Sequence, residues 1–107
     1  MSYELKVLPI VQSDLVTISE YFDKETGNKE KADKFILEVD TKINSLIYDF
    51  NIYQVRYKNV RLSHLIKFKY SIHYILDEKR ERIVVLAIFS MKENPEKWKK
   101  RFRQVFK

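Results

Sequence analysis

The sequence predicts a single α+β domain with the element order β-α-α-β-β-β-α, in which a two-helix hairpin packs on an antiparallel sheet. Two long apolar patterns in the first half have the period of helices. From Tyr53 onward, apolar residues recur at every second position, which is typical of strands. The chain has 107 residues, the size of one ordinary domain, so residues 1–107 are treated as one unit.

The first strand is predicted by alternating apolar and charged residues, and the first helix by residues that favour its start and its end. Tyr3, Leu5 and Val7 alternate with charged residues, so the segment that contains them is expected to be a strand. Pro9 suits a first helical turn, where no N–H is needed, and Gly27 can enter a left-handed helix end without steric cost. A first helix is therefore expected between them, with an apolar stripe of Val11, Leu15, Ile18 and Phe22.

A second amphipathic helix is expected directly after Gly27, which makes the two helices a hairpin. Asn28 can cap its start. Glu30 with Lys34, and Glu38 with Lys42, have the i,i+4 spacing of ion pairs on a solvent-facing side. The expected buried face consists of Ala32, Phe35, Ile36, Val39, Ile43, Leu46 and Ile47.

The second half predicts an antiparallel meander and a final helix. Val55, Tyr57 and Val60 suggest a strand with or without a bend, and the further strand candidates are 61–68, 70–76 and the central, nearly continuous apolar run 83–89. Asn94 and Pro95 then open a short helix over 96–106. With both helices of the hairpin on one face of the sheet, the other face is expected to be free and to carry basic residues.

The charge is divided unevenly along the chain. Residues 1–53 contain 6 Lys/Arg and 10 Asp/Glu, whereas residues 54–107 contain 15 Lys/Arg and 5 Asp/Glu, for a net charge of +6. A strongly basic half indicates a polyanionic or acidic partner. Solubility alone would be served equally well by mixed charges.

Composition excludes several classes of site. With 0 cysteines, 2 histidines and 1 glycine, the chain has no disulfide, no thiolate or histidine-rich metal site and no glycine-rich phosphate loop. We therefore expect no metal and no cofactor. The apolar runs are too short to span a bilayer, and the first residues show no export signal, so a cytoplasmic location is expected.

Several motifs, taken in their order and spacing, resemble the RelE/ParE toxin superfamily over nearly the whole chain. Each motif alone is weak, because most are core patterns. The matching residues are Asp14, Leu15, Ile18, Tyr21 and Phe22 in the first helix; Ala32, Phe35 and Ile36 in the second; the strand Phe68–Ile75; the strand Val85–Phe89; and Asn94, Pro95 and Trp98 at the end.

This resemblance implies the toxin of a bacterial type II toxin–antitoxin system, the kind also associated with plasmid stabilisation. Such a toxin is small, basic and cytoplasmic, and it forms a hetero-oligomer with a cognate antitoxin whose acidic, partly disordered tail wraps it. RelE-like members cut mRNA on the ribosome. ParE-like members lack that nuclease and inhibit DNA gyrase.

The nuclease pattern of the RelE-like branch is broken at three positions. Ser71 stands where RelE-like members carry an arginine, Ser90 where many carry a histidine, and Trp98 where many carry a tyrosine. An indole N–H only donates and cannot act as a base. The ParE-like branch is therefore favoured. A RelE-like endonuclease, and a degenerate toxin or plain nucleic-acid-binding domain, remain as alternatives.

Each of these functional hypotheses predicts a set of site residues, and each of those residues also has a purely structural interpretation. If the protein is a nuclease, the catalytic set is His73, Lys67, Lys69 and Lys92, although His73 faces away from Tyr70 and Tyr74 and fits a structural role better. Trp98 either seals the core or contacts a partner. Arg61, Lys67 and Lys69 would form one basic stripe in a regular strand. The expected partner-binding set is Arg61, Lys67, Lys69, Lys92, Trp98, Lys99, Lys100, Arg101 and Arg103.

Overall fold

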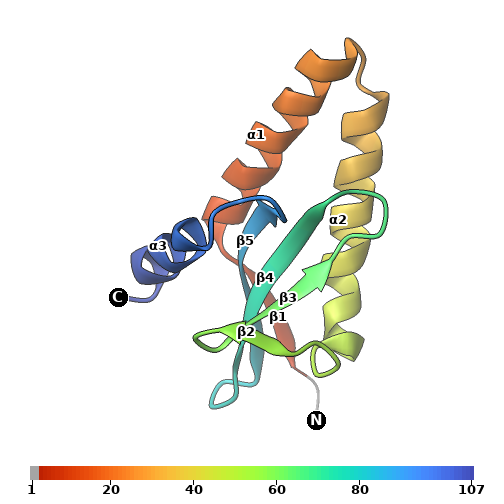
Figure 1. Cartoon of the computed structure of the whole chain (residues 1–107). Coiled ribbons are helices and arrows are strands. Elements are labelled where there is room, and N and C mark those ends of the chain that lie inside the picture. Colours follow the sequence, from red (N-terminus) through yellow and green to blue (C-terminus); the bar gives the residue numbers. More distant parts are fainter. Residues whose placement is uncertain (1–2) are drawn as a thin grey trace.

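A computed structural model describes residues 3–107 and confirms the α+β fold (Figure 1). The elements are β1 (Glu4–Val7), α1 (Pro9–Thr26), α2 (Glu30–Asp49), β2 (Val55–Tyr57), β3 (Val60–His64), β4 (Tyr70–Asp77), β5 (Arg82–Ser90) and α3 (Pro95–Val105). The strands that follow the hairpin number four rather than three. Lys58, with a φ of 49°, turns the chain between β2 and β3, so the two candidates before residue 65 form separate strands.

The five strands form one mixed sheet in the order β1-β5-β4-β3-β2. Successive strands from β2 to β5 run antiparallel to one another, as a meander requires. β1 instead pairs in parallel with β5, with Glu4 opposite Arg82 and Val7 opposite Val85. The sheet is therefore not purely antiparallel, because the first strand of the chain closes against the last.

The helical hairpin covers one face of this sheet with the predicted apolar core. Phe35 and Leu46 have no exposed surface, and the rings of Phe22, Phe35, Phe68 and Tyr70 pack edge to face or tilted with centroids 5.2–5.9 Å apart. Ala32, Val39 and Ile43 are buried as expected, Leu15 and Ile18 are partly buried, and Ile36 and Ile47 are exposed.

The predicted ends of the first hairpin helix are also confirmed. Pro9 lies in the first turn of α1, and Gly27 ends this helix with a φ of 74°. At the start of α2 the N-cap position is Lys29 rather than Asn28. The Asn28 side chain lies one position earlier and accepts a hydrogen bond from the Glu30 N–H at 2.9 Å.

The opposite face of the sheet is not free, which corrects the sequence-based expectation. α3 lies against this face of the sheet (Figure 1). Its apolar side chains pack against buried side chains of β3, β4 and β5; they are Trp98, Phe102, Val105 and Phe106. Lys97, Lys100 and Arg103 of α3 are exposed, whereas Arg101 turns toward the sheet. The expectation failed because a strongly amphipathic final helix has no other apolar surface to cover.

The strand expected over 61–68 ends at His64, and Leu65–Lys69 form a loop. Glu38 of α2 holds this loop, because its carboxylate accepts hydrogen bonds from the backbone N–H groups of Ile66 and Lys67. Among the described residues, no ion pair joins Glu38 to Lys42, whereas the expected Glu30–Lys34 pair forms at 3.0 Å.

Candidate partner interface

The exposed basic side chains of the predicted partner-binding set lie on two surfaces. Lys67 and Lys69 lie on the β3–β4 loop and Lys92 lies on the β5–α3 link. The Met91 N–H donates to the Lys69 carbonyl at 2.9 Å, so the loop and the link lie side by side. We call Lys67, Lys69 and Lys92 the loop lysines.

The second basic surface is the outer side of α3. Lys100 and Arg103 are exposed there. Lys99 is half-buried, and its Nζ lies 3.7 Å from a carboxylate oxygen of Glu96. Exposed ion pairs of this kind contribute little to stability, so these cations remain available to a partner. The outer side of α3 and the loop lysines together contain most of the predicted partner-binding set.

Arg61 does not belong to this exposed set, and the predicted stripe of Arg61, Lys67 and Lys69 does not form. The Arg61 guanidinium donates to the Tyr53 carbonyl at 2.7 Å and is partly buried. Lys67 and Lys69 lie beyond the end of β3, where the alternation of a strand no longer applies.

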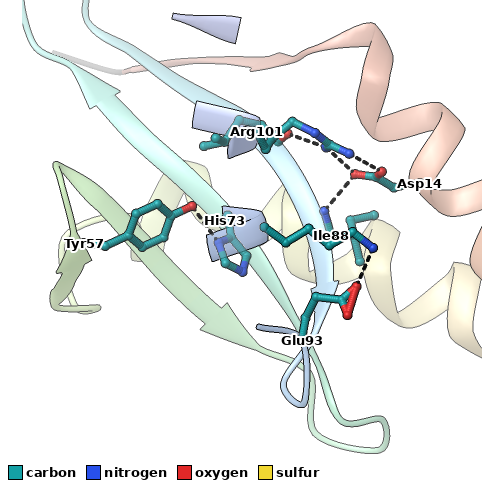
Figure 2. A network of polar contacts seen from close by, with 8 residues as sticks. Asp14, Tyr57, His73, Ile88, Glu93 and Arg101 are labelled. Atoms are coloured by element: carbon teal, nitrogen blue, oxygen red, sulfur yellow. Dashed lines mark hydrogen bonds and ion pairs between the residues drawn. The ribbon is translucent and has the colours of Figure 1, made fainter. Parts of the chain in front are cut away.

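The Arg101 side chain points into the protein, where it pairs with Asp14, and not into solvent. Its guanidinium donates to both carboxylate oxygens of Asp14 at 2.7 and 2.8 Å, and the two side chains are 13% and 12% exposed (Figure 2). The same guanidinium donates to the Leu86 carbonyl at 3.0 Å, and Asp14 accepts from the Ile88 N–H at 3.1 Å. This four-residue junction ties α1, β5 and α3 together.

The junction is needed because β1 is too short to cover β5. β1 ends at Val7, opposite Val85, and the register between β4 and β5 shifts around His73 and Tyr74. Leu86 and Ile88 lie beyond the reach of β1, so side chains of α1 and α3 satisfy their backbone groups instead. Sequence reasoning missed this role of Asp14. The available signal was a carboxylate within the apolar pattern of the first helix.

His73 is buried beneath α3. It has no exposed surface, and its Nδ1 lies 3.0 Å from the Tyr57 hydroxyl (Figure 2). The centroid of its ring lies 5.2 Å from that of Phe89 and 5.1 Å from that of Trp98. Burial lowers the pKa of His73 to about 3, helped by the nearby positive charges of Arg101 and Arg56. The imidazole is therefore neutral at physiological pH. Burial also raises the pKa of the Tyr57 hydroxyl.

Two serines that replace arginine and histidine of the nuclease pattern have local structural contacts. The Ser71 hydroxyl is buried and lies 2.5 Å from Nδ1 of His64. The Ser90 hydroxyl accepts from the Lys92 N–H at 3.2 Å, which shapes the link to α3. Trp98 is half-buried, packs against the apolar cluster beneath α3, and has its ring tilted against that of Tyr57 with centroids 5.5 Å apart.

A polar hollow of about 330 Å³ lies between α1, the end of β5 and α3. Tyr70 and Ser90 line it, together with two paired cations. Arg101 is held by Asp14, and both side chains are largely buried. Lys97 pairs with Glu93 at 2.8 Å, but this pair is exposed, so Lys97 remains available to a partner as Lys99 does.

Residues 3–107 contain no cluster of side chains suited to a metal ion. Within the same range, none of the helices combines the length and the apolar character needed to cross a bilayer.

The comparisons with known proteins bear on the fold. No protein-family model matches the chain, and no curated protein matches it. Among solved structures, it resembles a chain of the chromosomal ParDE toxin–antitoxin system from P. aeruginosa, with a TM-score of 0.70 and 22% identity over 82% of this chain and 95% of that one. It also resembles a mutant of the E. coli toxin RelE in the free state, with a TM-score of 0.66 and 10% identity over 99% and 100% of the two chains. The chain therefore has the fold of the RelE and ParE toxins.

Proposed function

We propose that the protein is the toxin of a type II toxin–antitoxin system, that it is ParE-like, and that it arrests growth by binding a protein target, DNA gyrase. The observation that carries this choice is the separation of His73 from the basic surfaces. His73 is buried and neutral under α3, whereas the loop lysines are exposed. The loop lysines therefore supply charge for binding without His73. The exposed His64, which ends β3 just before this loop, has its Nδ1 2.5 Å from the Ser71 hydroxyl.

Cleavage of RNA needs more than positive charge. The 2′-hydroxyl must lose a proton while the phosphate and the leaving oxygen are stabilised. Trp98 cannot accept a proton, and Arg101 is held by Asp14. Losing an acid–base partner typically lowers the rate by about 10²–10⁴-fold. We expect negligible cleavage of mRNA on ribosomes.

The runner-up is a ribosome-dependent endonuclease of the RelE type. The meeting of Lys67, Lys69 and Lys92 at one end of the sheet favours it, because three cations there could hold a phosphate. A degenerate toxin, or a domain that binds nucleic acid without cutting it, would also use these cations.

Two assays in parallel separate these functions. Purified protein is added to stalled ribosomes with a defined A-site codon, and to gyrase in a supercoiling reaction. We expect inhibition of supercoiling without codon-specific cleavage. Cleavage that a His73→Ala variant abolishes would overturn the ParE-like proposal, with the folding of that variant checked by circular dichroism. Inactivity in both assays would favour the degenerate or nucleic-acid-binding alternative.

Neutralisation is expected to use the outer side of α3. An acidic, disordered antitoxin tail is the natural complement of Lys99, Lys100 and Arg103. Reversing these three to Glu should slow association and reduce its dependence on salt. The matched control reverses Lys24, Lys58 and Lys79, which are exposed elsewhere, and changes the net charge equally. Equal slowing by both variants would show that total charge, rather than this surface, guides association.

A further inference from the structure

The two edges of the sheet differ in their protection against pairing. β2 has three residues and a register irregularity between Val55 and Tyr57, which are the features that normally blunt an edge strand. β1 is regular and pairs only with β5, so within residues 3–107 its outer backbone edge has no partner. Val7 on this edge is 43% exposed although it faces the helical side. β1 is the open edge.

An apolar groove of about 520 Å³ runs beside this open edge, between α1 and α2. Leu37 and Ile36 of α2 stand on its rim, 66% and 38% exposed. Its apolar lining comes from β1, α1, α2 and β5, through Leu5, Val7, Val11, Leu15, Val39, Ile43 and Ile88. Apolar side chains that approach along β1 would thus find an apolar surface to cover.

The sequence along β1 is complementary to itself when two copies run antiparallel. Tyr3, Leu5 and Val7 are apolar, Glu4 is acidic, and Lys6 is basic. When two such segments run antiparallel with Leu5 opposite Leu5, Glu4 lies opposite Lys6 and Tyr3 lies opposite Val7. Apolar residues then meet apolar ones on one face, and opposite charges meet on the other.

We propose that β1 is a self-association site, on which a second copy of this chain adds its own β1 antiparallel to form a two-fold dimer. The two five-stranded sheets would become one continuous sheet, with both helical hairpins on the same face. This inference concerns assembly and stands independently of the toxin assignment.

Backbone hydrogen bonding fits this register. The N–H groups of Glu4 and Leu8 point inward, to the carbonyls of Glu81 at 2.9 Å and Val85 at 3.1 Å. Alternate residues of a strand direct their backbone groups to opposite sides, so Leu5 and its neighbours two positions away face outward. In the proposed register these outward residues form the hydrogen-bonded pairs. Glu4 and Lys6 then occupy the closer, non-hydrogen-bonded pairs, where charges interact best.

Side-chain orientation fits as well. Tyr3 stacks on Phe50 with ring centroids 4.6 Å apart, so it lies on the helical side of β1 together with Leu5. Glu4 and Lys6 are exposed on the other side. The incoming copy would add its own Tyr3, Leu5 and Val7 along the groove. The strand alone is small beside a standard interface, so covering the exposed rim at Leu37 is part of what makes the contact stable.

The first test measures mass against concentration by sedimentation, in buffer of physiological ionic strength. We expect the mass to rise from 13.0 kDa toward twice that value. Glu4→Lys and Lys6→Glu each replace two attractive pairs by two repulsive ones and should weaken the dimer roughly tenfold. The double variant Glu4→Lys/Lys6→Glu restores both pairs and should recover dimerisation. These side chains are exposed, so the fold is kept. A monomer at all concentrations, or a dimer that ignores the single variants, overturns the proposal.

A crosslinking test fixes the register. The chain has no cysteine, so an introduced one reports unambiguously. Residues directly opposite in a hydrogen-bonded pair have Cα atoms about 5.5 Å apart, which a disulfide can span. Leu5→Cys should give a disulfide-linked dimer under mild oxidation, whereas Glu4→Cys should not, because its counterpart lies two positions along the opposite strand. Equal crosslinking of the two variants, or none with Leu5→Cys, overturns the proposed register.

Discussion

The two faces of the sheet are covered in different ways. Beneath the hairpin, five residues of α2 are buried and the packing is almost entirely aromatic and aliphatic. The buried hydroxyl group of Tyr74 on this side donates to the Phe50 carbonyl at 2.7 Å. Beneath α3 lie a neutral histidine and a buried ion pair, and no residue of α3 itself is fully buried.

Both faces bury apolar side chains, but within residues 3–107 only the α3 face adds a buried ion pair between helices. We therefore expect the hairpin face to contribute more of the stability and the polar contacts to fix the position of α3. Apolar burial is non-directional and contributes in proportion to area. Ion pairs such as Asp14–Arg101 contribute little net stability when intact, but they fix geometry and are costly to break. The attachment of α3 should therefore depend on polar contacts far more than the attachment of α2.

The strongest test of the hairpin face is Phe35→Ala. Phe35 has no exposed surface and touches the rings of Phe22, Phe68 and Tyr70. Emptying an aromatic core site lowers the free energy of unfolding by about 3–5 kcal/mol. Denaturant unfolding measures this loss. An unchanged midpoint would show that the hairpin face is not the stabilising one.

The matching test of the α3 face is Asp14→Ala. It leaves Arg101 unpaired and the Ile88 N–H unsatisfied, so we expect a loss of about 3 kcal/mol. Trp98 is the single tryptophan and lies on α3, so a red shift of its emission would report release of this helix. Asp40→Ala, at an exposed position of α2, is the control and should change stability by less than about 0.5 kcal/mol. Native Trp98 emission in Asp14→Ala would contradict the assigned role of the junction.

A smaller effect is expected from pH. The pKa of His73 is about 3 in the folded protein, below its ordinary value of 6.5, because burial disfavours the charged imidazole. The unfolded chain therefore binds the proton first, and stability falls as pH drops from 6.5 toward 3. Between pH 7 and pH 5 the loss should be about 2 kcal/mol. A His73→Gln variant should lack this part of the slope in urea unfolding at both pH values.

The smallest effect on stability is expected from the outer, solvent-facing side of α3, in contrast to its inner side, which carries Arg101. Reversing Lys99, Lys100 and Arg103 changes only its outer side, so the free energy of unfolding should move by less than about 0.5 kcal/mol. Thermal unfolding checks this. A large destabilisation would show that the outer side helps to hold α3, and that the binding test of these residues is confounded.

Much of the fold could be predicted because its signals are local. The apolar stripe around Phe35 has a helical period, Tyr70–Leu76 alternate strictly, and Gly27 can serve only a few backbone roles. The loop after His64 was missed because the decisive contact comes from Glu38, 28 positions before Ile66. Periodicity within a window cannot contain such a contact.

The candidate site was harder to predict for the same reason. Lys92 and Lys100 were correctly expected on the surface, since an isolated lysine is rarely buried. Arg101 looks equivalent to them in the sequence, yet it is inside, because Asp14 lies 87 positions away in the chain and beside it in space. Which cation of a basic helix turns inward depends on where the opposite charge lies in the tertiary structure.

The parallel pairing of β1 with β5 has a consequence for how the chain folds. Glu4 lies opposite Arg82, which is made 78 residues later, so the sheet cannot close until nearly the whole polypeptide exists. Long-range closures of this kind slow folding, because the entropy of a long loop is lost before any contact is gained. During synthesis the N-terminal strand must wait without its neighbour, and the complete fold, with every surface described above, forms only once the last strand has been released.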